Sequence, residues 1–232
     1  MCLNASVTWA TAGLGIATFL FVKAKGKPAC YYMAPLYFSL MEIIQGFMYI
    51  ELTHQSPLFL RILVYLAYLH VCFQPLVFNY WLGIFIRKEQ QQIYYFILKL
   101  CFVGGLLLFS RVFITDLTPL CSDIEALCNI TQKIYYGHHH IAWSLPLQTA
   151  GLHYFTPSIA LHMFLFFIPG ILLGLYRLML LMFVMGPLVS YLITPDVSEQ
   201  PAIWCVIGLW LLLMTLWAAL YHKLPNWLVP KA

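Results

Sequence analysis

Long apolar stretches recur along almost the whole chain, and their recurrence constrains the fold more than any other feature of the sequence. We interpret seven of them as membrane spans, at residues 7–22, 33–50, 59–84, 93–114, 156–175, 179–193 and 202–221. A helical crossing needs about 20 apolar residues, because each residue rises about 1.5 Å through a hydrocarbon layer about 30 Å thick. Inside lipid every backbone N–H and C=O must be paired within its own segment, so each stretch must be a helix. The sequence therefore predicts an all-α, polytopic transmembrane helical bundle with seven spans.

The composition agrees with this prediction. The 232 residues are 62% apolar and 9% charged, with a mean hydropathy of +0.84. A soluble domain is typically about 45–50% apolar and about 25% charged. So few charges cannot cover a water-facing surface, and we expect residues 1–232 to form a single domain within a lipid bilayer. The formal charge of +4 comes without a basic run, which argues against a nucleic-acid partner.

The boundary between the fifth and sixth spans is the least certain, because only residues 175–178 separate them. The two stretches together occupy about 40 residues, which is just enough for two crossings. One long, proline-kinked crossing followed by a buried segment is the alternative, and it gives six spans. We favour seven.

The positive charges predict the orientation, since Lys and Arg near the ends of spans stay on the cytoplasmic side. Eight of the twelve Lys and Arg follow the first, third, fifth and seventh spans: Lys23, Lys25, Lys27, Arg87, Lys88, Arg177, Lys223 and Lys231. We therefore expect the N-terminus outside, the C-terminus in the cytoplasm and one larger outward loop at about residues 115–154. The first residues lack a basic region, so we expect no cleaved signal peptide.

Polar side chains recur at helical spacing within the second span. Ser39, Glu42, Gln45 and Tyr49 are three, three and four residues apart, which places them on one helix face. A carboxylate that faced lipid would cost about 2.5–3.5 kcal/mol, so we expect this face to look into the bundle. A purely structural contact between helices is the alternative. For Glu42 we favour a functional role, because a charge in mid-span is costly to keep for packing alone.

The third span carries a polar pair beside a proline. His70 and Gln74 lie four residues apart on one face, and Pro75 follows directly. Pro75 cannot donate a hydrogen bond to the carbonyl of Val71, which is freed one turn back. A freed carbonyl beside two polar side chains predicts a polar pocket or a hinge, and a structural contact explains the pair equally well.

The fifth span repeats this arrangement. Ser158 and His162 lie four residues apart, and Pro169 frees the carbonyl of Leu165. We count both side chains among the candidate ligand- or ion-binding residues.

Glu42 and His70 are the centre of the site hypothesis. They lie at comparable depths in antiparallel neighbouring spans, so they are expected to pair directly or to hold a proton, a cation or a polar head group between them. The complete set of candidate ligand- or ion-binding residues is Glu42, Gln45, His70, Gln74, Ser158 and His162.

The outward loop contains three consecutive histidines, His138, His139 and His140, after Gly137. Imidazole is the commonest metal ligand, but consecutive histidines point in different directions, so a metal site would need His153 to join them through tertiary folding. We favour a polar loop at the membrane interface. Insertion of residues 141–147 into the bundle as a re-entrant segment is a further alternative.

Two covalent modifications are predicted in the same loop. Cys121 and Cys128 are seven residues apart, and an oxidising compartment would allow a disulfide between them. Asn129, in the sequence Asn-Ile-Thr, is a candidate glycosylation site on the outer side.

Several known classes of seven-helix protein are excluded or disfavoured. The last span has no lysine, which excludes a retinal Schiff base at the position used by rhodopsins. Asp-Arg-Tyr and Asn-Pro-x-x-Tyr are absent, which argues against a class A receptor. His-x3-His near the end of the chain, the pattern of ceramidase-like and adiponectin-receptor-like hydrolases, is absent as well.

The sequence thus favours a small transporter, channel or ligand-binding protein that is not an enzyme and handles an unidentified small molecule or ion. The first alternative is an intramembrane, metal-dependent enzyme that acts on a lipid. The second is a receptor-like or assembly subunit. No cofactor follows from the sequence, which excludes retinal and leaves a metal ion open. Either a homo- or a hetero-oligomer fits the sequence, and so does location in the plasma membrane or in an internal membrane.

Overall fold

The computed structural model describes residues 4–54, 56–113, 132–145, 159–196 and 198–221, and most of them are helical. The helices are α1 (Ala5–Ala24), α2 (Ala29–His54), α3 (Pro57–Leu82), α4 (Gln91–Ser110), α5 (Ile159–Leu172), α6 (Tyr176–Phe183), α7 (Val189–Ile193), α8 (Gln200–Ile203) and α9 (Cys205–Tyr221). Two 3₁₀ turns, Gly83–Phe85 and Lys88–Gln90, lie between α3 and α4. A π-helical turn, Val184–Leu188, joins α6 to α7. The two strands are β1 (Lys133–Tyr136) and β2 (Ile141–Ser144).

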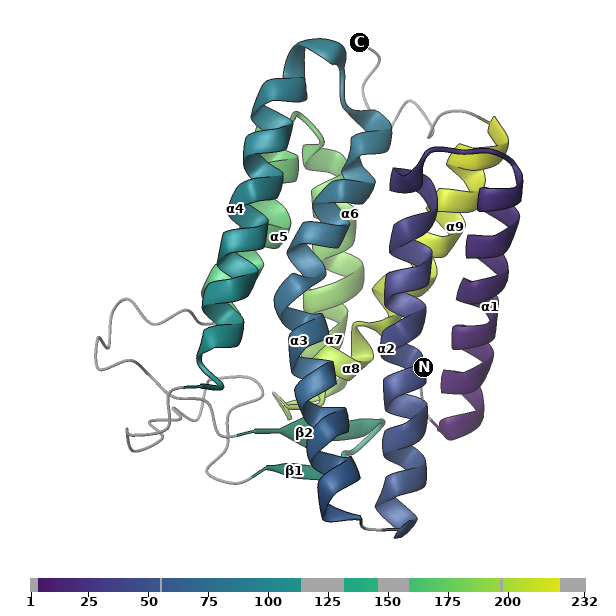
Figure 1. The fold of residues 1–232 in the computed structure, drawn as a ribbon, viewed down its shortest axis with the longest axis vertical. Coiled ribbons are helices and arrows are strands. Elements are labelled where there is room, and N and C mark those ends of the chain that lie inside the picture. Colours follow the sequence, from purple (N-terminus) through teal and green to yellow (C-terminus); the bar gives the residue numbers. More distant parts are fainter. Residues whose placement is uncertain (1–3, 55, 114–131, 146–158, 197, 222–232) are drawn as a thin grey trace.

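The long helices run side by side in an up-and-down bundle (Figure 1). α2 packs between α1 and α3, and α9 packs against α1 and α2. The α1–α2 and α3–α4 connections lie at one end, which we call the basic end because of its charges. The β1–β2 hairpin lies across the opposite end, which we call the hairpin end.

Within the described residues, six helical segments are long and apolar enough to cross a membrane: Ala5–Ala24, Ala29–His54, Pro57–Phe85, Lys88–Ser110, Tyr176–Ile193 and Gln200–Tyr221. The remaining apolar helix, α5, has 14 described residues. At about 1.5 Å per residue it reaches about 21 Å, which is less than the thickness of the hydrocarbon layer.

The chain reverses direction between α5 and α6, so these are two helices and not one kinked crossing. Gly174 has φ 80°, a left-handed conformation that favours glycine. The amide of Leu175 donates to the carbonyl of Gly170 at 2.8 Å and so closes the end of α5. The turn lies just before residues 175–178, which the sequence places between the two spans, because Gly174 sets where it forms.

The hairpin departs from the all-α expectation for the outward loop. β1 and β2 are antiparallel, with Ile134 opposite Trp143 and Tyr135 opposite Ala142. β-Branched and aromatic residues on both sides of a short, glycine-containing turn are the usual signal of a hairpin. All four residues of β2 are buried, so this segment packs into the end of the bundle.

Glycines let the helices approach closely. A side chain at Gly104 of α4 would collide with Leu165 of α5, and one at Gly105 would collide with Phe73 of α3. Small residues at helix contacts are typical of bundles in membranes, where close van der Waals packing drives association. These glycines therefore serve packing inside the bundle.

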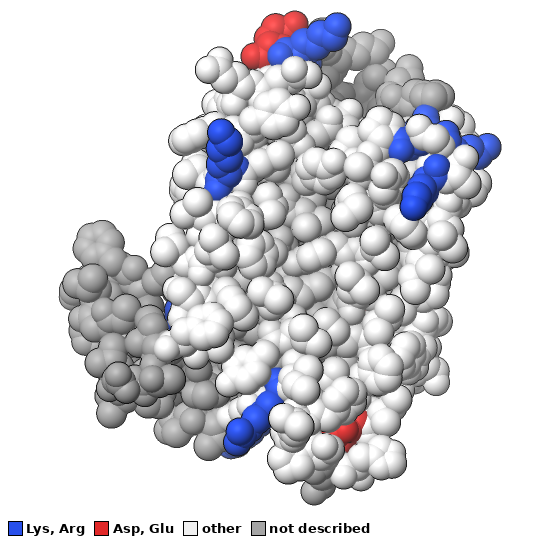
Figure 2. All heavy atoms as spheres, in the orientation of Figure 1, with Lys and Arg blue, Asp and Glu red and all other residues white. Residues whose placement is uncertain are grey.

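Charges concentrate at the ends of the bundle (Figure 2). The basic end carries Lys23, Lys25, Lys27, Arg87, Lys88 and Arg177. The hairpin end carries Arg61, Arg111 and Lys133 together with Glu51, Asp196 and Glu199. The face between them is almost wholly uncharged in the view shown.

Candidate functional site

The polar stripe of α2 is buried inside the bundle. Ser39, Glu42, Gln45 and Tyr49 are all buried, and Glu42 exposes 4% of its surface. The stripe faces inward because α1, α3 and α9 all pack against α2. A carboxylate at this depth is costly to bury, so its surroundings decide what it does.

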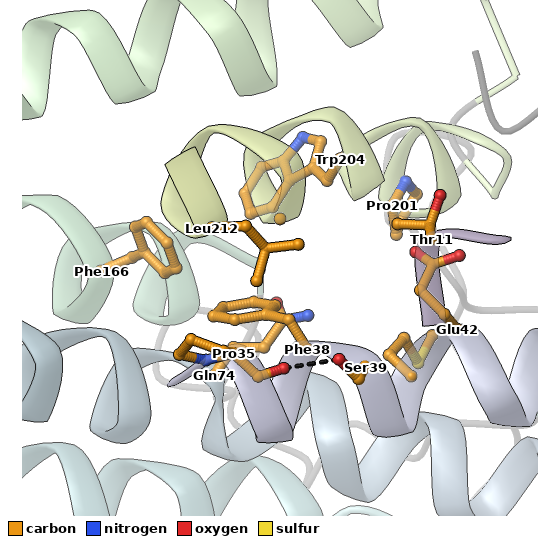
Figure 3. A pocket seen from close by; sticks show the side chains of 12 residues that line it. Thr11, Pro35, Phe38, Ser39, Glu42, Gln74, Phe166, Pro201, Trp204 and Leu212 are labelled. Carbon is orange, nitrogen blue, oxygen red and sulfur yellow. Dashed lines mark hydrogen bonds between the residues drawn. The ribbon is translucent and has the colours of Figure 1, made fainter. Parts of the chain in front are cut away.

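Glu42 and Ser39 line a cavity between six helices (Figure 3). The cavity measures about 30 Å³, room for one or two water molecules. Its described lining residues are Thr11 of α1, Pro35, Phe38, Ser39, Met41 and Glu42 of α2, Gln74 of α3, Phe166 of α5, Pro201 of α8, Trp204 between α8 and α9, and Gly208 and Leu212 of α9.

The cavity has a polar end and an aromatic end. At the polar end the Glu42 side chain extends toward Thr11 and Pro201. At the other end lie the rings of Phe38, Phe166 and Trp204. Among the described lining residues Glu42 is the single acid, and there is no Lys, Arg or His.

His70 faces a different part of α2 from the one we expected. Its Nε2 lies 2.7 Å from the carbonyl oxygen of Tyr37, and the Tyr37 hydroxyl donates to the carbonyl of His70 at 2.6 Å. The two rings stack with their centres 3.9 Å apart. Within the part of the chain that the structure describes, no hydrogen bond joins His70 to Glu42. The direct Glu42–His70 pair is therefore replaced by a reciprocal His70–Tyr37 contact, and Gln74 is the α3 residue that reaches the cavity with Glu42.

The carbonyl freed by Pro169 has found a donor in another helix. Asn79 of α3 donates from Nδ2 to the carbonyl of Leu165 at 2.9 Å and to the carbonyl of Pro75 at 2.8 Å. The Cys101 thiol of α4 lies 3.8 Å from the same Leu165 oxygen. Asn79 thus joins α3, α4 and α5 at the break in α5, and the sequence analysis did not single it out.

His162 of α5 lies beside the backbone carbonyl that Pro75 frees in α3. The backbone of Val71, whose carbonyl Pro75 frees, faces its ring. The ring is buried, with its centre 5.9 Å from that of Trp204 and 6.0 Å from that of Phe166. Neither ring nitrogen makes a hydrogen bond of ordinary geometry within the described part of the chain. His162 therefore lies against the rings at the aromatic end of the cavity.

Several predicted site residues lie outside the described residues. They are Ser158, His153, Cys121, Cys128 and Asn129. The predicted ligand, metal, disulfide and glycosylation roles of these residues stay predictions.

The backbone of the hairpin turn that contains His138, His139 and His140 binds the carboxylate of Glu199. The amides of His139 and His140 each donate to Oε1 of Glu199 at 2.5 Å, and the Thr194 hydroxyl donates to Oε2 at 2.6 Å. Glu199 is completely buried, and a Cβ at Gly137 would lie 2.6 Å from its carboxyl carbon. We call this arrangement the Glu199 clamp. It fastens the hairpin to the segment between α7 and α8.

The clamp also sets the charge state of Glu199. Burial raises the pKa of this carboxyl, but the hydrogen bonds from Thr194 and from the backbone of the three histidines outweigh burial. The pKa of Glu199 therefore lies below its ordinary value, and the clamp favours the carboxylate.

The histidine side chains line a second, open depression of about 600 Å³ at the hairpin end. His54, His138 and His139 are exposed there, and His140 is buried with its ring 5.7 Å from that of Tyr49. No group of three or more His, Cys, Asp or Glu side chains among the described residues is placed to hold a metal ion.

Of the site residues that were not predicted, Asn79 has a signal in the sequence. Asn79 follows Pro75 by one helical turn on the same face, and a polar residue there is well placed to meet a neighbour's freed carbonyl. Glu199 and Trp204 carried no such signal, because their roles depend on how α8 meets the hairpin and α5.

One family model matches the chain over residues 4–224 and is described as a family of unknown function, DUF5765. The match covers almost the whole chain, which therefore belongs to this family. No curated protein and no solved structure matches it.

Proposed function

We propose that this member of a family of unknown function is a seven-span integral membrane protein that binds a small polar solute or ion in the cavity beside Glu42. In this proposal it acts as a small transporter, channel or ligand-binding protein. The six long apolar helices support insertion in the bilayer. The reversal at Gly174 supports the fifth span of the sequence prediction as the additional crossing.

The charge distribution supports the proposed orientation. Six of the described Lys and Arg lie at the basic end, which we place in the cytoplasm: Lys23, Lys25, Lys27, Arg87, Lys88 and Arg177. The hairpin end and the N-terminus then face outside, and the C-terminus faces the cytoplasm.

The burial of Glu42 beside a cavity is the observation that carries the functional proposal. A mid-membrane carboxylate costs several kcal/mol, and ionisable residues at such positions generally mark ligand or ion pathways. A carboxylate retained for packing alone would have no need of an adjoining cavity. Three of the helices that line this cavity, α2, α3 and α5, contain an internal proline, whose missing N–H frees a backbone carbonyl.

Glu42→Gln in purified protein tests the proposal, with Glu89→Gln as the matched control. Glu89 is an exposed acid at the basic end, so the control makes the same chemical change away from the cavity. Each protein is tested with a panel of solutes that comprises alkali cations, small amines, amino acids and sugars. With wild type we expect at least one solute to be taken up into proteoliposomes or to stabilise the protein against heat. Glu42→Gln should abolish that effect and leave the fold intact, and Glu89→Gln should behave as wild type does.

Equal uptake and equal thermal stabilisation for wild type, Glu42→Gln and Glu89→Gln across the whole panel would overturn the proposal. Glu42 would then be a structural polar group, and the bundle would have its function elsewhere.

A further inference from the structure

We propose that the cavity beside Glu42 binds a small ammonium-type cation, namely ammonium or a primary methylammonium. The inference rests on the proposed function and adds the chemical class of the ligand. Four features of the cavity carry it: its charge, its aromatic rings, the direction of its hydrogen bonds and its size.

The charge of the cavity favours a cation. Among its described lining residues Glu42 is the single acid, and none is Lys, Arg or His. A cavity whose charged lining side chain is a carboxylate attracts cations and repels anions.

The aromatic end favours an organic or ammonium-like cation. Phe38, Phe166 and Trp204 present three rings to a space that Glu42 closes from the other side (Figure 3). Aromatic faces attract ammonium groups through the ring quadrupole, and Trp attracts them best. Hard metal ions prefer to be surrounded by oxygen atoms, which this end of the cavity does not offer.

The hydrogen bonds of the lining favour a ligand rich in donors. The Ser39 hydroxyl donates to the carbonyl of Pro35 at 2.6 Å, and the Thr11 hydroxyl donates to the carbonyl of Val7 at 3.0 Å. Both hydroxyl protons are thus used within their own helices, and each oxygen offers lone pairs to a ligand. The carboxylate of Glu42 is likewise an acceptor. An ammonium nitrogen has only donors, which matches these acceptors.

The size of the cavity limits the ligand. A volume of about 30 Å³ admits one or two water-sized groups. Ammonium occupies about one such group and methylammonium about two, whereas tetramethylammonium requires the walls to move.

The test is the thermal unfolding midpoint of the full-length protein in nanodiscs, titrated with the chlorides of ammonium, methylammonium, tetramethylammonium and sodium at constant ionic strength. We expect saturable increases with ammonium and methylammonium and none with the other two. Glu42→Gln should lower the apparent affinity about tenfold or more, because it removes a charge-assisted hydrogen bond. Trp204→Leu should lower it about two- to fivefold, and Trp204→Phe should retain most of it.

Gly208→Leu separates failure of this inference from failure of the proposed function. A Cβ at Gly208 meets no atom closer than 3.9 Å, so a larger side chain can fill the cavity from α9. Suppose that ammonium has no effect, and that a neutral solute such as acetamide stabilises wild type but not Gly208→Leu. That result would overturn the proposal that the ligand is a cation and would leave the proposed binding function standing. An equal response to sodium would also overturn the ammonium class.

If no solute has an effect and Gly208→Leu simply raises the midpoint, the cavity is a packing defect and both proposals fail. Glu89→Gln should respond to ammonium as wild type does. Loss of the response in that control would show a non-specific charge effect and overturn the inference.

Discussion

Asn79 compensates for a break that a proline makes in a different helix. Pro169 removes the helical donor of the Leu165 carbonyl, and the amide of Asn79 reaches across from α3 to replace it at 2.9 Å. The bond ties two helices at the point where one of them is weakened. A buried carbonyl without a donor would cost about 1–3 kcal/mol, so this amide matters more than an ordinary polar contact.

We predict that Asn79→Leu lowers the free energy of unfolding by about 1–3 kcal/mol, because Leu has a similar volume but no donor. Reversible unfolding in mixed micelles measures the change. Ser110→Ala is the control, since the Ser110 hydroxyl is exposed and bonds within its own helix. Its effect should stay within about 0.5 kcal/mol. Equal effects of the two substitutions would show that Leu165 does not depend on Asn79.

The freed carbonyls could be predicted from the two prolines, but their partners could not. Helical spacing places His70 and Gln74 on one side of α3 and Asn79 on roughly the opposite side, yet it does not say which neighbour each one meets. The rotation and depth of α3 against α2 and α5 decide that His70 reaches Tyr37 and that Gln74 reaches the cavity. Those quantities follow from packing over the whole helix.

At the scale of elements, the Glu199 clamp joins a hairpin to a helical segment far along the chain. Its strength depends on pH, because the hydrogen bonds lower the pKa of Glu199 in the folded protein. A carboxyl with a lowered folded-state pKa stabilises the fold fully above its unfolded pKa of about 4.3. That contribution is lost as the pH falls through the lower, folded-state pKa.

We therefore predict that the amides of residues 133–144 exchange slowly with deuterium near neutral pH, after correction for intrinsic rates, and lose protection on acidification. Glu199→Gln should reduce the protection at neutral pH and flatten its pH dependence. The cost should be about 1.5–3 kcal/mol, the range for hydrogen bonds to a charged group. Glu89→Gln should keep the wild-type profile. A profile unchanged by Glu199→Gln would show that other contacts hold the hairpin.

The helices were predictable and the hairpin was not, for a physical reason. Long apolar runs must become helices in lipid, so these runs set the approximate bounds of the six long helices among the described residues. Residues 133–144 lie outside that constraint. Their strand pairing was readable from Ile134, Trp143 and the glycine between them, but the burial of β2 depends on the space left at the end of the bundle.

At the scale of the whole molecule, the two ends differ in charge and in covering. The basic end has short connections and a concentration of Lys and Arg, whereas the hairpin covers the other end. This asymmetry is the basis of the orientation that we propose, and it makes the span count testable, since seven spans put the two termini on opposite sides.

We predict that Tyr136→Cys, in a background without other cysteines, reacts with a membrane-impermeant maleimide in intact cells. Lys25→Cys and Arg177→Cys should react only after permeabilisation. All three positions are exposed in the structure. Reaction of Arg177→Cys in intact cells would place both ends of α5 outside and favour six spans. Reaction of Lys25→Cys without permeabilisation would invert the orientation.

The short helix α8 has a mechanical consequence. Glu199, which accepts hydrogen bonds from the hairpin, directly precedes it, and Trp204, which lines the cavity, directly follows it. A rigid displacement of these six residues would move both contacts together. We therefore expect release of the hairpin and the shape of the cavity to be coupled through a segment little longer than one helical turn.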